Sequence, residues 1–372
     1  MGYVVVREPF MLLETVSMLY KYVNGITFQS ELSRLKQLVD APVYEILNRR
    51  AGWLQEILFK VCKGLDPTDP VLQKYFSKVS LEVADVCLAY FMTHSFVTAK
   101  KPGYWDNVDE ICAIWRDIQN RGARIDPRSI NGFLFSQDSD ETTDLFSQVK
   151  VLNLPPEFRL ELYEAMKDFE KNLRSLAERL EPLAINLQEN YRQERWLLEE
   201  SVNHWEAEFQ KMPPLDFLAA FAGKAFTESA GEETVVAVSL MNSSQLVVEM
   251  ASGLYLHGEH NVFFVGACMT TESIPKRKEG NLERIGVILK YLGDWKRLEI
   301  LRQLNKKQGY GLELAERMGM DSGNMSRILV QLHQYGFLQQ EREALRNYYR
   351  TDRTVIRKFL KSVETAILED ES

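Results

Sequence analysis

A single glycine between two short amphipathic segments near the C-terminus constrains the fold of this chain more than any other feature. The first segment ends at Met318, and Gly319 follows it, a residue type that adopts positive φ without steric cost. After the glycine, Asp321 or Ser322 can cap a new helix by accepting hydrogen bonds from its free backbone N–H groups. The sequence therefore predicts two helices joined by a sharp turn.

The second of these helices has an apolar side and a polar side. Its apolar residues recur at steps of three and four, which places them on one face: Met325, Ile328, Leu329, Leu332 and Tyr335. We expect this face to pack on the two preceding helices. The opposite face and the first turn carry small, polar or basic residues, with one valine among them: Ser322, Gly323, Asn324, Ser326, Arg327, Val330, Gln331 and Gln334.

A β-hairpin is predicted directly after this helix. Residues 337–351 contain two short β-type runs around a charged tip at residues 341–347. The tip has no Asn-Gly or Gly-Gly pair, so the turn type stays open. A helix–turn–helix followed by a hairpin is the layout of a winged helix-turn-helix, which presents a recognition helix to the major groove and a wing to the phosphates of duplex DNA.

The side chains on these elements suit contacts to nucleic acid. Arg327 can pair with a guanine edge or grip a phosphate, while Asn324 and Gln331 can read adenine or bridge through water. The wing arginines can hold phosphates. The predicted DNA-binding residues are Ser322, Gly323, Asn324, Ser326, Arg327, Gln331, Arg342, Arg346 and Asn347. For each residue alone, a solvated polar surface is the alternative interpretation.

Charge is divided unevenly along the chain. Residues 276–360 carry 18 Lys and Arg against 10 Asp and Glu, a net charge of +8. The whole chain has a net charge of −8, so the remainder carries −16. This asymmetry fits a basic DNA reader joined to an acidic body.

Residues of about 282–368 resemble the DNA-binding domain of ArsR-type bacterial transcriptional regulators, over roughly a quarter of the chain. The resemblance rests on four elements: Leu292-Gly293-Asp294 with Arg297-Leu298 and Ile300-Leu301, Glu313-Leu314-Ala315, Ser326-Arg327, and Tyr348-Tyr349. It implies a homodimer formed through the helix before the first element and the helix after the wing.

Two apolar stripes fit that implied interface. One contains Leu282, Ile285, Ile288, Leu289 and Leu292, and the other contains Val355, Ile356, Phe359, Leu360, Val363 and Ile367. Packing inside one chain is the competing explanation. Many metal-sensing members of the family carry cysteines before the recognition helix, whereas residues 309–314 contain none, so we do not expect metal sensing there.

Other chemistry is not expected. The four cysteines stand singly, and the His257/His260 pair lies in a predicted hairpin turn without a third ligand. Phosphate-binding loops and nucleophile elbows are missing from the sequence. We therefore expect no metal, no cofactor and no enzymatic activity. The sequence has no apolar stretch of about 18 residues, which predicts a cytoplasmic protein without a membrane segment.

The rest of the chain reads as helices followed by a small sheet. Residues 11–154 predict successive amphipathic helices, and a near-heptad seam from Leu162 to Leu180 predicts a long helix that Pro182 should kink or restart. A second long helix should follow. Whether the helices near residues 157–211 contribute to dimerisation or only to the core stays open.

Strands are predicted at residues 234–240, 245–250 and 261–266, in an antiparallel sheet that residues 3–6 can join. A charged hinge at residues 274–280 then marks the main boundary. The predicted fold class is mainly α (α+β). Residues 1–275 form a mostly helical sensing or assembly region with a β-sheet from about 233–268, and residues 276–372 form the winged-helix domain with a C-terminal dimerisation helix.

These observations predict a sequence-specific DNA-binding transcriptional regulator. Its partners would be double-stranded DNA, a second copy of the chain, and an unidentified small-molecule or protein effector acting on the N-terminal region. The alternative is an interaction or adaptor protein whose winged helix contacts protein, because fold does not determine function. The two differ in salt dependence, since DNA affinity falls steeply as salt rises.

Overall fold

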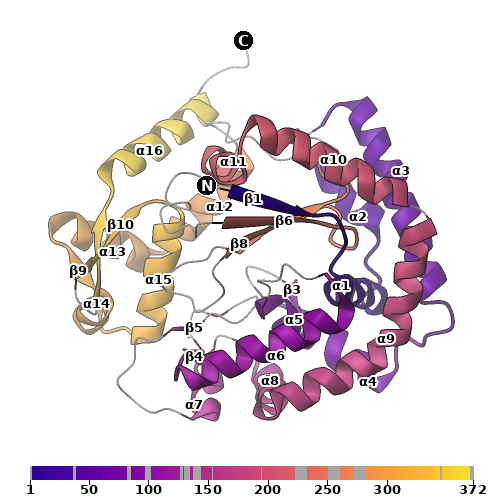
Figure 1. The fold of residues 1–372 in the computed structure, drawn as a ribbon. Helices are drawn as coiled ribbons and strands as arrows, with labels where there is room; N and C mark the ends of the chain where they lie inside the picture. Colours follow the sequence, from indigo (N-terminus) through magenta and orange to yellow (C-terminus); the bar gives the residue numbers. More distant parts are fainter. Residues whose placement is uncertain are drawn as a thin grey trace. The chain divides into compact units, whose positions relative to one another are not determined.

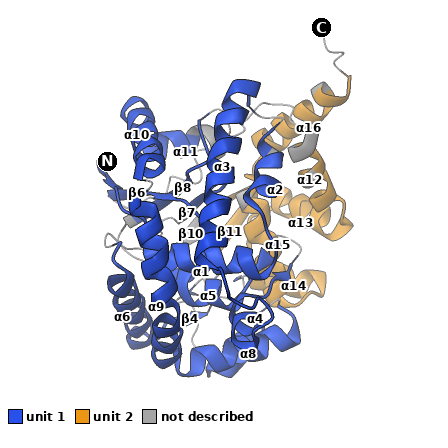
Figure 2. Cartoon of the chain, turned by 90° about the vertical axis from the view of Figure 1, so that its right-hand side faces the viewer, with its two compact units in different colours: residues 1–219, 227–275 blue, residues 220–226, 276–372 orange. Residues whose placement is uncertain are grey.

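The structure is a computed structural model that describes residues 2–36, 39–81, 85–96, 102–125, 129, 135–136, 144–152, 154–193, 195–222, 233–249, 260–271, 282–343 and 346–368. The chain forms two compact units (Figure 2): unit 1 contains residues 1–219 and 227–275, and unit 2 contains residues 220–226 and 276–372. The predicted hinge at residues 274–280 lies outside the described residues.

Helices dominate the first 222 residues, so the mainly helical prediction is confirmed. They are α1 (Met11–Val23), α2 (Phe28–Leu32), α3 (Ala41–Val61), α4 (Pro70–Phe76), α5 (Leu88–Thr93), α6 (Tyr104–Asn120), α7 (Leu145–Lys150), α8 (Pro156–Lys167), α9 (Phe169–Gln193), α10 (Arg195–Lys211) and α11 (Pro214–Ala222). Two 3₁₀ turns, Ser33–Leu35 and His94–Phe96, and two short hairpins join them; the hairpins are β2 (Val79–Ser80) with β3 (Asp85–Val86) and β4 (Arg124–Ile125) with β5 (Phe135–Ser136). Of the helices that the structure describes, none is long and apolar enough to cross a membrane.

The break in the predicted long helix lies elsewhere than expected. The chain leaves helical geometry at Asp168, with φ −121° and ψ 52°, between α8 and α9. Pro182 instead lies inside α9, which continues to Gln193. Leu180, Ala184 and Leu187 are buried on both sides of the proline, and their packing offsets the backbone hydrogen bond that proline removes.

Unit 1 contains a four-stranded sheet in the order β1-β6-β8-β7. Its strands are β1 (Gly2–Val6), β6 (Glu233–Ser239), β7 (Leu246–Glu249) and β8 (His260–Gly266). As predicted, the N-terminal strand joins the sheet. The predicted antiparallel arrangement is wrong for most of it, because β1 pairs with β6 in parallel and β6 pairs with β8 in parallel. Only β7 and β8 are antiparallel.

Side chains on both faces of the sheet are packed against other parts of unit 1, as is typical of parallel strands. Successive side chains point to opposite faces: Phe264 packs against Phe10 before α1, with ring centroids 5.4 Å apart, and Phe263 faces Phe209 of α10 at 6.4 Å. In Figure 1, β1, β6 and β8 accordingly run side by side. Strands covered on both faces are continuously apolar, as in parallel sheets.

Unit 2 alternates helices with short strands. Its elements are α12 (Leu282–Leu292), α13 (Trp295–Lys306), β9 (Gly309–Tyr310), α14 (Gly311–Met318), α15 (Ser322–Gln334), β10 (Leu338–Glu343), β11 (Arg346–Thr351) and α16 (Arg353–Leu368). The three strands form an antiparallel sheet in the order β10-β11-β9. One apolar core joins them, to which α13, α14 and α15 contribute Ile300, Leu304, Leu314, Met325, Leu329 and Leu332.

The turn between α14 and α15 has the predicted geometry. Gly319 adopts φ 60° and ψ 36°, the left-handed conformation. The N–H of Gly319 donates to the carbonyl of Glu316 at 3.2 Å, and the N–H of Met320 donates to the carbonyl of Ala315 at 2.9 Å. This pair of bonds satisfies the last carbonyls of α14 and ends the helix.

Candidate nucleic-acid interface

Helix α15 has the two faces that the sequence predicts. Met325, Ile328, Leu329 and Leu332 are buried in the core of unit 2, and Tyr335 packs against that core. The predicted polar residues Ser322, Gly323, Asn324, Ser326, Arg327 and Gln331 lie on the same helix; Ser322 is exposed and the others are partly buried. The structure therefore brings six of the nine predicted site residues onto one helix.

Asp321 defines where this helix begins. Its carboxylate accepts a hydrogen bond from the backbone N–H of Asn324 at 2.9 Å, so Asp321 is the N-cap and Ser322 is the first helical residue. A Cβ at Gly323 would lie 3.1 Å from the carboxylate oxygen of Asp321. Glycine thus lets the capping carboxylate lie close to the first turn, while the Ser322 side chain stays exposed.

Arg327 differs from several other arginines of unit 2 because it has no hydrogen bond or ion pair with the described residues of that unit. Arg302 forms two hydrogen bonds to Glu299, at 2.6 and 2.8 Å, and they lower the pKa of that carboxyl to about 2. Arg317 pairs with Glu313, and Arg353 donates to Asn305 at 2.5 Å. Among these four arginines, Arg327 is therefore the one whose guanidinium has no bond to break, within the described part of unit 2, before it contacts an external acceptor.

The β10–β11 hairpin places the predicted wing residues opposite one another. Arg342 pairs in register with Asn347, and Glu343 pairs with Arg346. The side chain of Asn347 is partly buried, while those of Arg342 and Arg346 lie outside the described part of the chain. Arg350 donates to Gln339 at 3.0 Å. This bond uses one of the five N–H donors of the Arg350 guanidinium, so a phosphate could bind Arg350 through the others.

One polar contact of α15 was not predicted from the sequence. The amide Nε2 of Gln331 donates to the hydroxyl of Tyr335 at 3.4 Å. The two residues are four positions apart on a helix, a spacing at which side chains meet. That spacing was visible in the sequence, but Tyr335 had been assigned only to the apolar face.

A second set of polar residues, in unit 1, was also missed. Glu14, Ser17 and Lys21 of α1 are almost fully buried, and Glu14 and Ser17 bond to the end of β6 and the loop that follows it. Glu14 accepts from the Ser239 hydroxyl at 2.7 Å and from the backbone N–H groups of Leu240 and Met241 at 3.1 and 2.7 Å. Ser17 accepts from the amide of Asn242 at 2.9 Å.

We call Glu14, Ser17 and Lys21 the α1 stripe. Lys21 forms an ion pair with Glu31, whose second carboxylate oxygen accepts a hydrogen bond from Ser244 at 3.3 Å. The spacing of three and four positions within the α1 stripe is the only sequence signal that unites its residues, and it is also the pattern of an ordinary solvent-facing helix surface.

Hydrogen bonds fix the protonation of His94, which lies beside the α1 stripe. The Thr93 hydroxyl donates its proton to the carbonyl of Ala89 at 2.7 Å, so it accepts from Nδ1–H of His94 at 2.9 Å. Nε2 is then the acceptor, and Ser17 lies 3.3 Å from it. Desolvation lowers the pKa of this imidazole to about 3, so His94 is neutral near pH 7.

Desolvation acts in the opposite direction on the acidic groups of unit 1. Burial raises the pKa of Glu14, although its four donors, Tyr191 included, oppose the shift. Burial also raises the pKa of Cys62 and Cys87 to about 12. All four cysteines are buried and free. Because the thiolate is the reactive form, this environment disfavours nucleophilic cysteine chemistry.

Within the described ranges, no group of three or more His, Cys, Asp and Glu side chains is placed to hold a metal ion. The predicted turn at His257 lies outside those ranges, and β8 begins at His260. The features that remain for a functional assignment are the polar face of α15, the adjoining hairpin and the exposed side of α16. No protein-family model, no curated protein and no solved structure matches this chain.

Proposed function

We propose that residues 276–372 form a winged helix-turn-helix domain that binds duplex DNA sequence-specifically, and that the chain is a transcriptional regulator. The observation that carries the proposal is the connectivity of unit 2. Helices α13 and α14 precede a tight glycine turn, α15 follows it, and the β10–β11 hairpin completes a three-stranded sheet with β9. This is the order of elements that a winged helix uses to place one helix in the major groove.

The chemistry of α15 favours DNA over other ligands. Arg327 can donate two parallel hydrogen bonds to a guanine edge, and Asn324 offers the donor and acceptor pair that matches adenine. Neither side chain is engaged within the described part of unit 2. The net charge of +8 over residues 276–360 adds sequence-independent attraction to phosphates.

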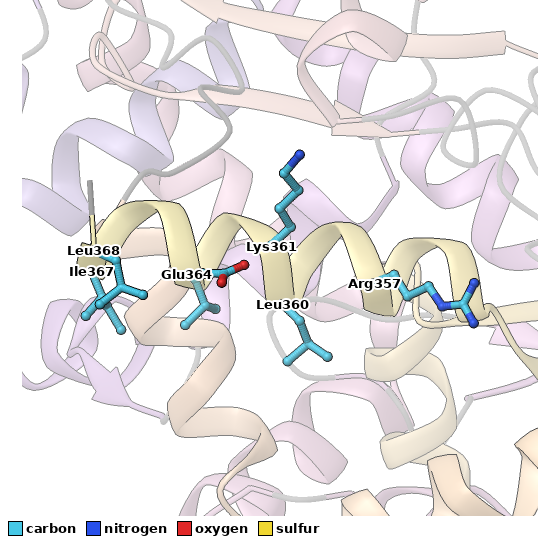
Figure 3. A pocket seen from close by; sticks show the side chains of 7 residues that line it. Arg357, Leu360, Lys361, Glu364, Ile367 and Leu368 are labelled. Carbon is cyan, nitrogen blue, oxygen red and sulfur yellow. The ribbon is translucent and has the colours of Figure 1, made fainter. Parts of the chain in front are cut away.

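A second copy of the chain is the partner we propose for α16. One side of this helix packs on the core of unit 2 through Val355, Ile356 and Phe359. Farther along, Leu360, Ile367 and Leu368 are exposed, by 58%, 66% and 72%. Figure 3 shows that these three side chains point to the same side of α16, where they line a shallow hollow. Charged side chains, Lys361 among them, also line this hollow.

An apolar stripe of this kind suits an isologous contact, in which the same helix of two copies meets across a two-fold axis. Leu289 of α12 is also exposed, by 42%, and α12 contacts α16. Ile285 and Ile288 of α12 are buried within the single chain. Part of the apolar stripe of α12 is thus buried within the chain, and Leu289 is exposed and can contact a second copy.

Sedimentation of the full chain tests the homodimer. Leu360→Glu combined with Ile367→Glu should convert the dimer to a monomer, because two carboxylates would be desolvated at the contact. Lys358→Glu is the matched control, because Lys358 is an exposed residue of α16 that does not line the hollow, and it should leave the dimer intact. A wild-type monomer at micromolar concentration, or a dimer in the double variant, would contradict the proposal.

Unit 1 is assigned the sensing or assembly role, with the effector unidentified. An effector would act through different affinities for two arrangements of the chain. We propose that the protein works in the cytoplasm, where thiols such as those of its four buried cysteines stay reduced.

DNA binding is tested by selecting duplexes from fragmented genomic DNA with the full chain and measuring their affinity at rising salt. We expect enrichment of one sequence and a steep loss of affinity as salt rises. Arg327→Ala should weaken the selected duplex roughly 5- to 150-fold. Arg302→Ala removes an arginine that is already paired with Glu299 and should change little.

Absence of enrichment at low salt would refute the DNA-binding proposal. It would favour instead an interaction protein that uses the same domain for protein contacts.

A further inference from the structure

We infer that Tyr335 is a positioning residue that fixes the amide of Gln331 for reading an adenine base. This inference rests on the proposed DNA-binding function and names one determinant of its sequence preference. Gln331 is one of the polar residues of α15, and Tyr335 is the residue at the C-terminal end of the same helix.

The ring of Tyr335 is held from two sides. It lies against Tyr291 of α12, with centroids 5.2 Å apart, and against Phe337 at 6.3 Å. Tyr291 is itself covered by the guanidinium of Arg297, which lies 3.8 Å from the ring centroid.

Arg297 also donates from Nη1 to the carbonyl of Tyr291 at 2.6 Å. This bond ties α13 to the last turn of α12. The ring that carries the Tyr335 hydroxyl is therefore held by a stack of side chains from α12 and α13. Its position does not depend on the flexible side chain of Gln331.

The hydroxyl accepts one N–H of the Gln331 amide at 3.4 Å. An amide has two N–H donors and one carbonyl acceptor, so one N–H and the carbonyl oxygen stay available. That pair is the complement of adenine, which presents N7 as an acceptor and N6 as a donor in the major groove. Holding the amide before DNA arrives removes the entropy cost of ordering a long side chain on binding.

This arrangement explains why a polar hydroxyl ends an otherwise apolar face. Phenylalanine would fill the same space and make the same ring contacts. The hydroxyl adds the contact to Gln331 and has no other hydrogen bond with the described residues of unit 2. The ring of Tyr335 thus has the packing role and its hydroxyl has the positioning role. Tyr335→Phe removes only the hydroxyl and therefore tests the positioning role alone.

The experiment selects duplex DNA from a random library with the full chain and compares four proteins. Wild type should prefer adenine at one position of each half-site, by roughly 5- to 150-fold over the other bases. Gln331→Ala should abolish that preference alone. Tyr335→Phe should lower this preference roughly 2- to 12-fold, because the amide is no longer held before binding and must be ordered on the DNA.

Tyr291→Phe is the matched control, since it removes a hydroxyl from the same stack without touching Gln331, and it should keep the wild-type profile. Affinity for an unrelated duplex should be equal in all four proteins. A wild-type profile in Tyr335→Phe, or a retained adenine preference in Gln331→Ala, would overturn the inference while leaving the DNA-binding proposal standing. If wild type selects no sequence, the DNA-binding proposal itself fails.

Discussion

The neutral state of His94 makes the stability of unit 1 sensitive to mild acid. The imidazole has a pKa of about 3 in the folded chain, against about 6.5 in an unfolded chain. As pH falls, the imidazole of His94 is therefore protonated in the unfolded chain at a pH at which it is still neutral in the folded chain. The part of the free energy of unfolding that depends on a neutral His94 is fully present above pH 6.5 and is lost between about pH 6.5 and pH 3.

The expected size follows from this difference. Relative to about pH 8, a group with these two pKa values lowers the free energy of unfolding by about 2 kcal/mol at pH 5. His94→Gln keeps an acceptor for the Ser17 hydroxyl but cannot be protonated. Wild type should therefore lose about 2 kcal/mol more than the variant between those two pH values.

Urea denaturation followed by tryptophan fluorescence measures this difference. A Trp295→Phe background isolates unit 1, because the other five of the six tryptophans lie within it. Carboxyl groups such as Glu14 titrate in both proteins and cancel in the comparison. Equal pH dependence of the free energy of unfolding in wild type and His94→Gln would show that protonation of His94 does not cause the loss of stability in acid.

Three further changes should shift the free energy of unfolding, each followed by its urea midpoint. Gly319→Ala should lower the free energy of unfolding by about 1–2 kcal/mol through left-handed backbone strain alone, since nothing lies within 4 Å of the added Cβ. Gly319→Asn should recover part of this loss. Equal losses in the two variants would argue against backbone strain. Glu14→Gln should cost roughly 2–4 kcal/mol, because an amide cannot accept from all four donors, and a neutral result would mean that the loop after β6 pairs elsewhere. Pro182→Ala should stabilise the chain by about 1–3 kcal/mol, as helix propensity outweighs the entropy that proline removes from the unfolded state; a loss of stability would show that α9 needs the proline.

Features set by neighbouring residues could be predicted from the sequence. Gly319, Asp321 and the three- and four-residue spacing from Met325 to Leu332 act within one turn or one helix, so the turn, the cap and the buried face of α15 were all foreseen. Of the candidate site, the sequence identified the polar face of α15. It did not identify the contact between Gln331 and Tyr335, because Tyr335 has both an apolar and a polar role.

Features set by distant partners could not be predicted. The parallel pairing of β6 with β8 joins strands that are distant in the sequence, and the uninterrupted apolar run from Val235 to Val238 is the one local sign of it, since strands of parallel sheets are covered on both faces. Glu14 looks like the polar side of an amphipathic helix, yet it is buried, and the partners that satisfy it are distant: Tyr191 lies 177 positions later in the chain and the other three donors lie more than 220 positions later. Sequence spacing does not reveal such a partner.

The pairing of β1 with β6 sets a condition on how this protein is made. Gly2 pairs with Glu233, so β1 cannot pair until the residues up to β6 have been synthesised. Helices with local contacts can form meanwhile, but closing so long a loop is slow. Nascent molecules will carry an apolar strand with unpaired edges, and we expect synthesis in the cell to depend on chaperones that shield Tyr3 to Val6 until β6 arrives.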